Sequence, residues 1–178
     1  TTVDILGMRS TMPCAIAPVG LLGMQHADGE IIAAQVAEDF GIPFTLSTMS
    51  ICSIEDVARH TKEPFWFQLY VMKDHSFSKK LIDRAKKADC SALMLTVDLQ
   101  ILGQRHKDIR NGLSTPPKLT IKNVINLMKH PKWCFNMIKT SRRSFRNIVG
   151  HVEGVSDISK LSAWVSEQFD PKLSWDDV

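Results

Sequence analysis

The sequence predicts an α/β fold in which four short parallel strands alternate with helices. Four apolar runs recur along the chain, helical periodicity separates them, and each run ends in polar residues. Short apolar runs in this setting are typical of buried parallel strands. The runs and their ends are Cys14–Ala17 before Pro18-Val19-Gly20, Phe44–Leu46 before Ser47-Thr48, Phe65–Phe67 before Gln68-Leu69-Tyr70, and Leu93–Leu95 before Thr96-Val97-Asp98. We therefore predict the first half of a (β/α)8 TIM barrel, with a candidate site where the polar ends meet.

Helices are predicted between the runs from spacing and capping residues. The first should extend from Asp28, as N-cap, to Phe40, with Gly41 as the C′ residue. The second should begin at Ser53, because Ser53 and the aspartate three residues later resemble a capping box. A third helix is predicted from a single apolar stripe, formed by Phe77, Leu81, Ala85 and Ala88. Ser174 is the expected N-cap of a fourth helix that starts near the end of the sequence.

The composition is that of a globular protein with one ordinary core. The chain has 178 residues, of which 44% are hydrophobic and 23% charged. No apolar stretch approaches the roughly 20 residues that span a bilayer. The four cysteines are widely spaced, so we expect buried, reduced thiols, Cys14 and Cys90 among them, and neither disulfides nor metal ligands. Thr1 is not an initiator methionine, so we expect residues upstream of it in the complete protein.

Positive charge is concentrated in one segment. Residues 114–152 contain eight Lys or Arg and no Asp or Glu, which leaves 14 basic against 19 acidic residues elsewhere. A solvated insertion, a nucleic-acid-binding segment and a membrane-surface segment are the three interpretations. No nucleic-acid recognition motif accompanies the charges, so no nucleic-acid partner is expected. Surface cations attract anionic lipid by about 1 kcal/mol each, and this segment offers interfacial anchors, which favours the membrane surface. The candidate anchors are Trp133, Phe135, Met137 and Ile138.

These patterns divide the chain into three parts. Residues 1–113 are predicted to form the half barrel with strands one to four. Residues 114–153 would be a basic, membrane-associating insertion in the loop after the fourth strand. Residues 154–178 would be the return segment and the start of the fourth helix.

Five motifs resemble the FMN-dependent 2-hydroxy-acid dehydrogenase/oxidase family in order and spacing. They are Ala17-Pro18-Val19-Gly20, Leu46-Ser47-Thr48, Phe67-Gln68-Leu69-Tyr70, Leu95-Thr96-Val97-Asp98 and Gly103-Gln104-Arg105. Residues 99–108 and 168–177 are most similar to the membrane-associated bacterial L-lactate dehydrogenases of that family. The resemblance covers the whole chain and implies FMN as the cofactor, a small 2-hydroxy acid such as L-lactate as the substrate, and no metal.

The resemblance also implies roles for the polar strand ends. The backbone of Pro18, Val19 and Gly20 would line one face of the isoalloxazine ring. The polar edge of the ring would be hydrogen-bonded by neutral side chains, which supply donors and acceptors without an unwanted charge. These side chains are Ser47, Gln68 and Thr96. Taken singly, each of the three is equally compatible with an ordinary polar residue that closes a strand.

Three further residues would serve substrate and catalysis by the same resemblance. Tyr70 and Arg105 would hold the substrate, because a guanidinium grips a carboxylate bidentately, and Tyr70 would also belong to the catalytic set. Asp98 would orient a catalytic histidine by fixing its tautomer and stabilising its protonated form. Each also has an ordinary interpretation: Tyr70 as a strand-end residue, Asp98 as a cap and Arg105 as a solvated loop residue.

The chain departs from the family because much of the expected site has no counterpart. The second half of the barrel supplies a lysine near the flavin N1, the catalytic histidine, a second arginine and the phosphate site. We therefore expect the N-terminal half of an L-lactate dehydrogenase, inactive alone, that pairs with a complementary C-terminal half or with itself. The complete enzyme would pass electrons through FMN to a quinone or another acceptor at the cytoplasmic face of a bacterial inner membrane. The alternative is a non-catalytic half barrel, from a split or degraded gene, that binds lipid or a partner at most.

Overall fold

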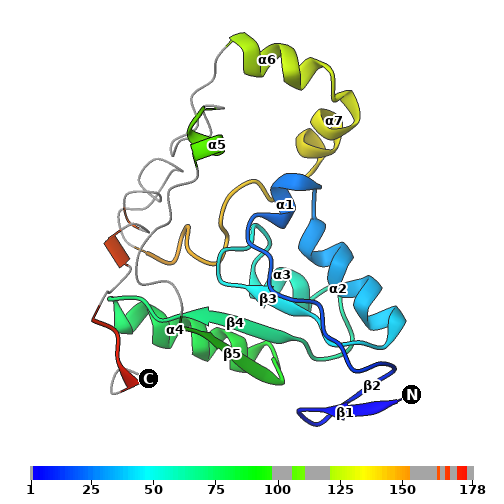
Figure 1. Ribbon diagram of the computed structural model, residues 1–178, viewed down its shortest axis with the longest axis vertical. Coiled ribbons are helices and arrows are strands. Elements are labelled where there is room, and N and C mark those ends of the chain that lie inside the picture. Colours follow the sequence, from blue (N-terminus) through cyan, green and yellow to red (C-terminus); the bar gives the residue numbers. More distant parts are fainter. Residues whose placement is uncertain are drawn as a thin grey trace.

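Three parallel strands form the central sheet, in the order in which they occur in the chain. The computed structural model describes residues 2–97, 106–110, 121–152, 164, 167–168 and 172–175. The strands β3 (Thr45–Ser47), β4 (Trp66–Tyr70) and β5 (Ala92–Thr96) neighbour one another in that sequence. Their register pairs Ser47 with Gln68, and Tyr70 with Thr96. All carboxyl ends therefore lie at one edge of the sheet, as predicted (Figure 1).

The first apolar run is shorter as a strand than predicted. Only Ile16 forms a ladder contact there, a parallel bridge to Phe44 beside β3. The Ile16 N–H donates to the Pro43 carbonyl and the Ile16 carbonyl accepts from the Thr45 N–H. Pro18 lacks an N–H, so it cannot continue this ladder, and before Ile16 the Cys14 N–H donates to the Met12 carbonyl (2.8 Å) and not to β3. Cys14 in this run is exposed and not buried as expected, although all four cysteines are free thiols.

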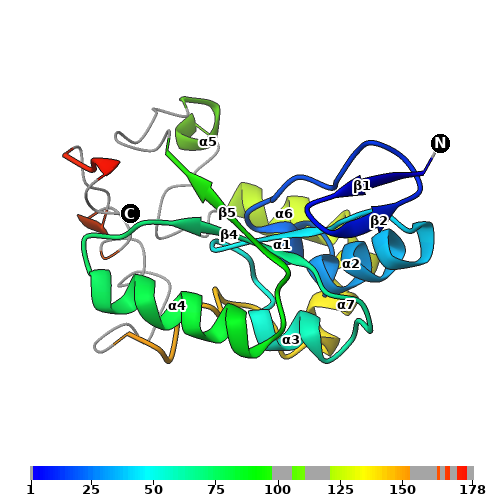
Figure 2. The ribbon, with the colours of Figure 1, turned by 90° about the horizontal axis from the view of Figure 1, so that it is seen from below.

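Three helices cover one face of the sheet and bury the core. They are α2 (Gly29–Phe40), α3 (Ile54–Ala58) and α4 (His75–Lys87). Figure 2 shows α3 and α4 on the same side of the strands. Alternate strand residues such as Leu46, Phe67 and Leu69 face these helices and belong to one buried cluster with them. The opposite strand residues, which include Ser47 and Gln68, are left to face the barrel interior.

Most local predictions about these helices are confirmed. Ser53 and Asp56 form the expected capping box, with both reciprocal hydrogen bonds. Gly41 ends α2 with a φ of 74°, in the left-handed region that favours glycine. The stripe on α4 is buried at Phe77, Leu81 and Ala85, and Ala88 packs partly against the same core. Only residues 172–175 of the fourth helix start are described, so that helix stays a prediction.

Asp28 is the N-cap residue of α2, as predicted, but its side chain does not cap the helix. Its own φ is 58°, and its side chain makes no capping hydrogen bond. The carboxylate instead accepts a hydrogen bond from Thr140 Oγ1 (2.8 Å) and one from Arg142 Nη1 (3.1 Å). A charge-assisted contact with a distant segment has replaced the weaker local cap.

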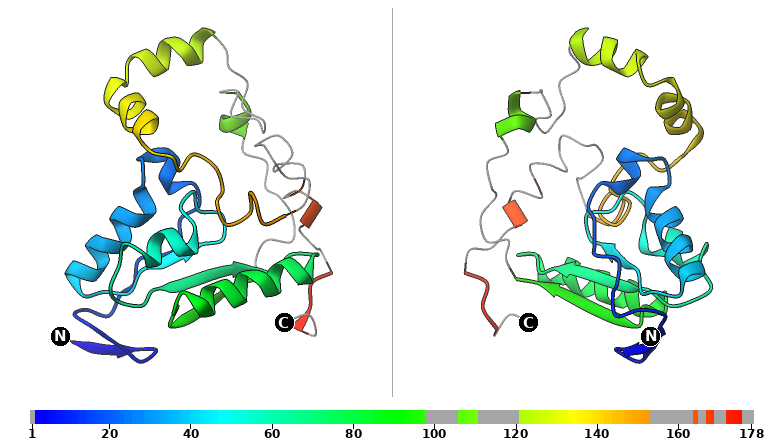
Figure 3. Two further views of the ribbon diagram at one scale, coloured as in Figure 1. Left: turned by 180° about the vertical axis from the view of Figure 1, so that it is seen from behind. Right: turned by 45° about the vertical axis from the view of Figure 1, so that its right-hand side comes forward.

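Several elements were not predicted. The strands β1 (Val3–Ile5) and β2 (Met8–Ser10) form an antiparallel hairpin at the N-terminus. The short helices α1 (Leu22–Gln25) and α5 (His106–Arg110) lie in loops. The basic segment is helical, with α6 (Ile121–Met128) and α7 (Pro131–Lys139). Both views in Figure 3 place α6 far from the N-terminal hairpin. The proposed part boundaries at 113 and 153 lie outside the described residues and stay predictions.

The isolated chain is expected to self-associate. Leu93 and Val97, in and after β5, are exposed large apolar side chains, and β5 pairs only with β4 in the described part of the chain. Unpaired strands with apolar surface recruit further strands. Light scattering coupled to gel filtration should therefore report dimers or larger species that disappear when a C-terminal half is supplied. A monodisperse monomer at high concentration would contradict this expectation.

Candidate functional site

A row of hydrogen-bonded polar side chains crosses the carboxyl ends of the three strands. Ser47 Oγ donates to Gln68 Oε1 (3.1 Å), and Gln68 Nε2 donates to Thr96 Oγ1 (2.8 Å). The Thr48 N–H also donates to Gln68 Oε1 (3.2 Å), while the Thr48 hydroxyl donates to the Gln68 carbonyl (2.6 Å). Ser47, Thr48 and Gln68 are buried, and Thr96 is half-buried. The structure thus brings together the three neutral side chains singled out in the sequence.

The loop after the first apolar run lies beside this row. The Leu21 N–H donates to the Met49 carbonyl (3.0 Å), which joins the loop after the first run to the loop after β3. A Cβ on Gly20 would lie 3.5 Å from Met49 Cβ, so the two loops are in ordinary contact there. Val19 is exposed, and Pro18 is half-buried. An exposed backbone segment next to a row of polar side chains can form one wall of a ligand site.

The other predicted site residues are only partly described. Tyr70 ends β4, is half-buried, and its N–H donates to Thr48 Oγ1 (3.3 Å). Its backbone is therefore tied to the row at Ser47 and Gln68. Asp98 and Arg105 lie outside the described residues, so their roles stay predictions. No cluster of three or more His, Cys, Asp or Glu positioned for a metal ion occurs among the described residues.

Comparison with known proteins decides the family. Residues 1–178 match the FMN-dependent dehydrogenase family. The chain belongs to this family. It is 42% identical to the L-lactate dehydrogenase of Haemophilus influenzae over 179 residues, which cover 100% of this chain and 47% of that protein. The chain therefore spans about half the length of the relatives it matches.

Solved structures agree with this assignment to the FMN-dependent dehydrogenases. The monotopic membrane protein (S)-mandelate dehydrogenase superposes with a TM-score of 0.89 at 32% identity, covering 98% of this chain and 46% of that chain. A mandelate oxidase variant with a C4a-OH-FMN adduct superposes with a TM-score of 0.61 at 40% identity, covering 65% of this chain and 35% of that chain. The fold is thus that of the N-terminal part of the FMN-dependent TIM-barrel dehydrogenases.

The polar row fits the cofactor of the FMN-dependent dehydrogenases. The pyrimidine edge of a flavin carries neutral donors and acceptors, and so does the row formed by Ser47, Gln68 and Thr96. Within the row, one N–H of Gln68 Nε2 donates to the Thr96 hydroxyl oxygen. The second N–H of Gln68 and the hydroxyl proton of Thr96 are additional donors by their chemistry. A flavin edge placed on the row would meet donors already fixed in position.

A buried carboxylate fixes the loops that carry the site. Glu30 is 1% exposed and accepts hydrogen bonds from the N–H groups of Gly23 (2.9 Å) and Ile51 (2.9 Å). It thereby joins α1 to the loop that follows β3. A Cβ on Gly23 would lie 2.6 Å from Ile51 Cβ, so only glycine fits at this junction. Burial, followed by the nearby Glu30 charge, raises the pKa of Cys52, so this thiol stays protonated.

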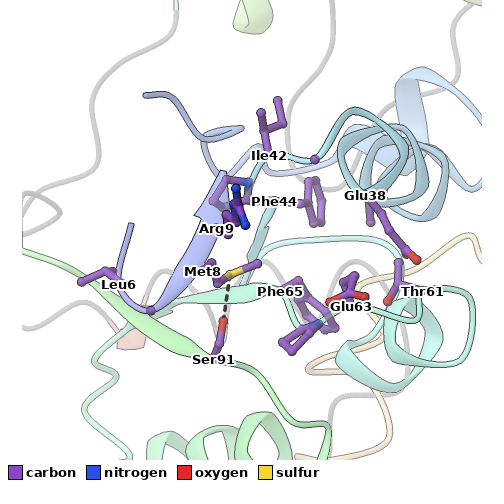
Figure 4. A pocket seen from close by; sticks show the side chains of 15 residues that line it. Leu6, Met8, Arg9, Glu38, Ile42, Phe44, Thr61, Glu63, Phe65 and Ser91 are labelled. Atoms are coloured by element: carbon purple, nitrogen blue, oxygen red, sulfur yellow. Dashed lines mark hydrogen bonds between the residues drawn. The ribbon is translucent and has the colours of Figure 1, made fainter. Parts of the chain in front are cut away.

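A pocket of about 460 Å³ lies away from this row, beside the N-terminal hairpin, where the Ser91 hydroxyl donates to Met8 Sδ (3.2 Å). Figure 4 shows its wall, to which Phe44 and Phe65 contribute. These two residues directly precede β3 and β4, so the pocket is at the amino ends of the strands. In barrel enzymes chemistry occurs at the carboxyl ends, so we assign the pocket no catalytic role.

The basic segment divides into two parts with different surroundings. Arg142 and Arg146 form ion pairs with the buried carboxylate of Asp56, and Arg142 also pairs with Asp28. Arg143 donates to the carbonyls of Ile138 and Thr140 at the end of α7. Two of the eight cations, Arg142 and Arg146, are therefore paired with carboxylates within the fold, and counting all eight toward a lipid surface was wrong.

Two of the four candidate membrane anchors also proved wrong. Trp133 is half-buried, and its indole Nε1 donates to the Met24 carbonyl of α1 (2.9 Å), while Met137 is buried. The Trp133 hydrogen bond attaches α7 to α1. Phe135 and Ile138 are exposed, and Lys139 Nζ lies 4.3 Å from the centre of the Phe135 ring. Four more exposed apolar side chains form a face on α6; they are Ile121, Val124, Ile125 and Met128.

Acid is expected to destabilise the fold through Glu55. Arg84 donates to both carboxylate oxygens of Glu55, at 2.7 and 2.8 Å, and these hydrogen bonds lower the pKa of Glu55 from 4.5 to about 2. A lowered folded-state pKa contributes stability above the unfolded value, and this contribution is lost as pH falls from about 4.5 to about 2. The melting temperature of Glu55→Gln should therefore change less over this pH window than that of the parent. If the melting temperatures of the two proteins change equally with pH over this window, the Arg84–Glu55 pair contributes nothing to the pH dependence of stability.

Proposed function

We propose that the complete protein is an FMN-dependent L-2-hydroxy-acid dehydrogenase that oxidises L-lactate to the 2-oxo acid. The hydrogen-bonded row of Ser47, Gln68 and Thr96 at the carboxyl edge of the sheet carries this proposal. When bound, FMN accepts the two electrons that leave the substrate. This chain would supply the donors and acceptors at the pyrimidine edge and, through Pro18 to Gly20, one wall for the ring.

The remaining site residues would act on the substrate. Arg105 would bind the carboxylate bidentately, and Tyr70, at the end of β4, would hold and polarise the same substrate. Asp98 comes two positions after Thr96, the last residue of β5, and would hold the imidazole of a histidine from the C-terminal half. This histidine would take the proton of the substrate hydroxyl as a general base. L-lactate is favoured as substrate by the name of the Haemophilus influenzae relative.

We also propose a peripheral location at a membrane, with a quinone or another membrane acceptor for the electrons. The support is the exposed apolar face of α6 with Phe135 and Ile138 on α7. The (S)-mandelate dehydrogenase relative is itself described as a monotopic membrane protein. No helix in the described part of this chain has the length and apolarity that a bilayer crossing needs. We place the protein at the cytoplasmic face of a bacterial inner membrane.

A completed enzyme separates this function from a non-catalytic half barrel. The chain fused to the C-terminal half of the Haemophilus influenzae relative should bind FMN and be bleached by L-lactate. Gln68→Ala should weaken FMN binding, because Gln68 connects all three strand ends. A colourless fusion that folds but neither binds FMN nor reacts with lactate would favour the non-catalytic alternative, in which the half barrel binds lipid or a partner at most.

Arg105→Lys tests the substrate site separately from the cofactor site. Lysine keeps the charge but loses the planar fork, so kcat/KM for lactate should fall by about 10- to 100-fold, the value of a charged hydrogen bond. FMN should remain bound. Arg110→Lys is the matched control, because Arg110 is an exposed arginine in the same loop region. Loss of FMN with unchanged lactate kinetics would show that Arg105 has a different role.

A further inference from the structure

Asn147 is a fully buried amide that reaches the strand end carrying Ser47. Its Nδ2 lies 3.3 Å from the Ser47 carbonyl, 3.4 Å from the Thr48 carbonyl and 2.9 Å from Ser50 Oγ, and donates to them. Its Oδ1 accepts from the Ile54 N–H (3.0 Å), at the first turn of α3. The exposed fraction of Asn147 is 0%. One side chain thus spans the whole connection from β3 to α3.

This chemistry requires an amide. The carbonyls of Ser47 and Thr48 need a donor, and the Ile54 N–H needs an acceptor, within the same buried space. Only the amides of Asn and Gln offer two N–H donors and a carbonyl acceptor without charge, and Asn has the shorter side chain. Arg84 fixes the opposite side by donating to the Asn147 carbonyl (2.8 Å) and to its Oδ1 (3.3 Å). Because Arg84 is itself paired with Glu55, the amide has little freedom to turn.

Asn147 also belongs to the last part of the basic segment, after α7. It follows Arg146, which pairs with Asp56 on α3, and it precedes Ile148, which is buried in the core. The last part of the basic segment, residues 146–148, therefore packs on the connection between β3 and α3. Nothing in the sequence around Asn147 marks it as part of a site, because its partners lie about 100 residues earlier.

We propose that Asn147 is a positioning residue for the flavin-binding end of β3. It holds the backbone carbonyls of Ser47 and Thr48, which belong to two successive peptide units, and so fixes the direction of the Ser47 hydroxyl toward Gln68. It does not touch the cofactor itself. The proposal rests on the proposed function, since Ser47 is a cofactor contact only if the flavin edge binds at this row.

The test measures FMN affinity in the fusion with the relative's C-terminal half. Asn147→Asp replaces the donor by an acceptor of the same shape, and Asn147→Ala removes both groups. Each should weaken FMN binding by about tenfold, the value of a lost buried hydrogen bond. Ile148→Ala is the control, because Ile148 is equally buried next to Asn147 but makes no side-chain hydrogen bond. It should lower the melting temperature and leave the dissociation constant of FMN within about twofold.

A positioning role also predicts coupling with Ser47. Adding Asn147→Ala to Ser47→Ala should weaken FMN binding less than Asn147→Ala does in the parent, because residues that act through one another are not additive. If Asn147→Ala weakens FMN binding equally in the parent and in Ser47→Ala, the proposal is overturned. It is also overturned if Ile148→Ala weakens FMN binding as much as an Asn147 variant with the same melting temperature. If the Asn147 variants do not fold, Ser50→Ala is the deciding variant, because it removes one hydrogen-bond partner of the Asn147 amide. Ser50→Ala should then weaken FMN binding. Unchanged FMN binding by Ser50→Ala would overturn the proposal.

Failure of the proposed function would look different. In that case the parent fusion would not bind FMN, or Ser47→Ala and Gln68→Ala would bind it as the parent does. A parent that binds FMN, with Ser47→Ala weakened and both Asn147 variants normal, would overturn the role of Asn147 alone.

Discussion

The chain without a C-terminal half is expected to oxidise L-lactate at least about 10²- to 10⁴-fold more slowly than the completed fusion. A positioned general base contributes that much to proton removal, before any loss of flavin positioning. None of the six histidines of the chain directly follows β3, β4 or β5, where a base could reach the substrate. They are His26, His60, His75, His106, His130 and His151. Asp98 would have no imidazole to orient in this chain alone.

Dye reduction by purified protein measures this difference. Both proteins should be saturated with FMN and produced in a host that lacks its own lactate dehydrogenases. A fusion in which the catalytic histidine of the C-terminal half is replaced by alanine is the matched control, and its activity should fall toward that of the chain alone. Turnover by the chain within about tenfold of the complete fusion would show that the base is on this half or that the reaction needs none.

Features set by neighbouring residues could be predicted from the sequence. The capping box at Ser53, the left-handed Gly41 and the apolar stripe on α4 each depend on residues within a few positions of one another. The carboxyl ends of β3, β4 and β5 could be predicted in the same way, because each apolar run stops at polar residues that mark where the strand ends. The row of Ser47, Gln68 and Thr96 was therefore predictable as a group, since parallel neighbours bring their ends together.

Features set by distant residues could not be predicted. Asp28 pairs with Arg142, Trp133 donates to Met24, and Asn147 holds Ser47, and each contact joins residues about 100 positions apart. Local rules found the N-cap position of Asp28 but not the partners of its carboxylate, and they assigned Trp133 to a membrane surface because its hydrogen-bond partner was not visible in the sequence. A run of basic residues likewise does not reveal which cations pair with a buried carboxylate such as Asp56.

These contacts also determine how membrane attachment can be tested. Deleting residues 114–152 would remove Arg142, Arg146 and Asn147 together with the buried Ile148, so lost activity would not distinguish attachment from folding. Substitutions on the exposed face of α6 avoid this problem. Ile125 and Met128 are 52% and 76% exposed, so replacing them removes little from the core.

Ile125→Ser with Met128→Ser in the completed fusion is expected to reduce binding to phosphatidylglycerol-containing vesicles by at least about 100-fold. Burying a large apolar side chain is worth about 1.5–3 kcal/mol, and each 1.4 kcal/mol is a factor of ten. Serine leaves the net charge unchanged, so the attraction of Lys129, Lys132 and Lys139 for anionic lipid remains. That remaining part should weaken as salt rises, because surface charges are screened over about 10 Å at 0.1 M.

Asn126→Ser is the matched control on the same helix, because Asn126 is an exposed polar residue and offers no apolar surface. It should co-sediment with vesicles as the parent does, and all variants should reduce a soluble dye at the parent rate, since α6 carries none of the proposed site residues. Unchanged vesicle binding by the double variant would mean that the apolar face of α6 does not enter the lipid. Loss of dye reduction along with vesicle binding would instead mean that α6 supports the site. That result would contradict the division of the basic segment into an outer apolar face and an inner part held at Asp56 by Arg142 and Arg146.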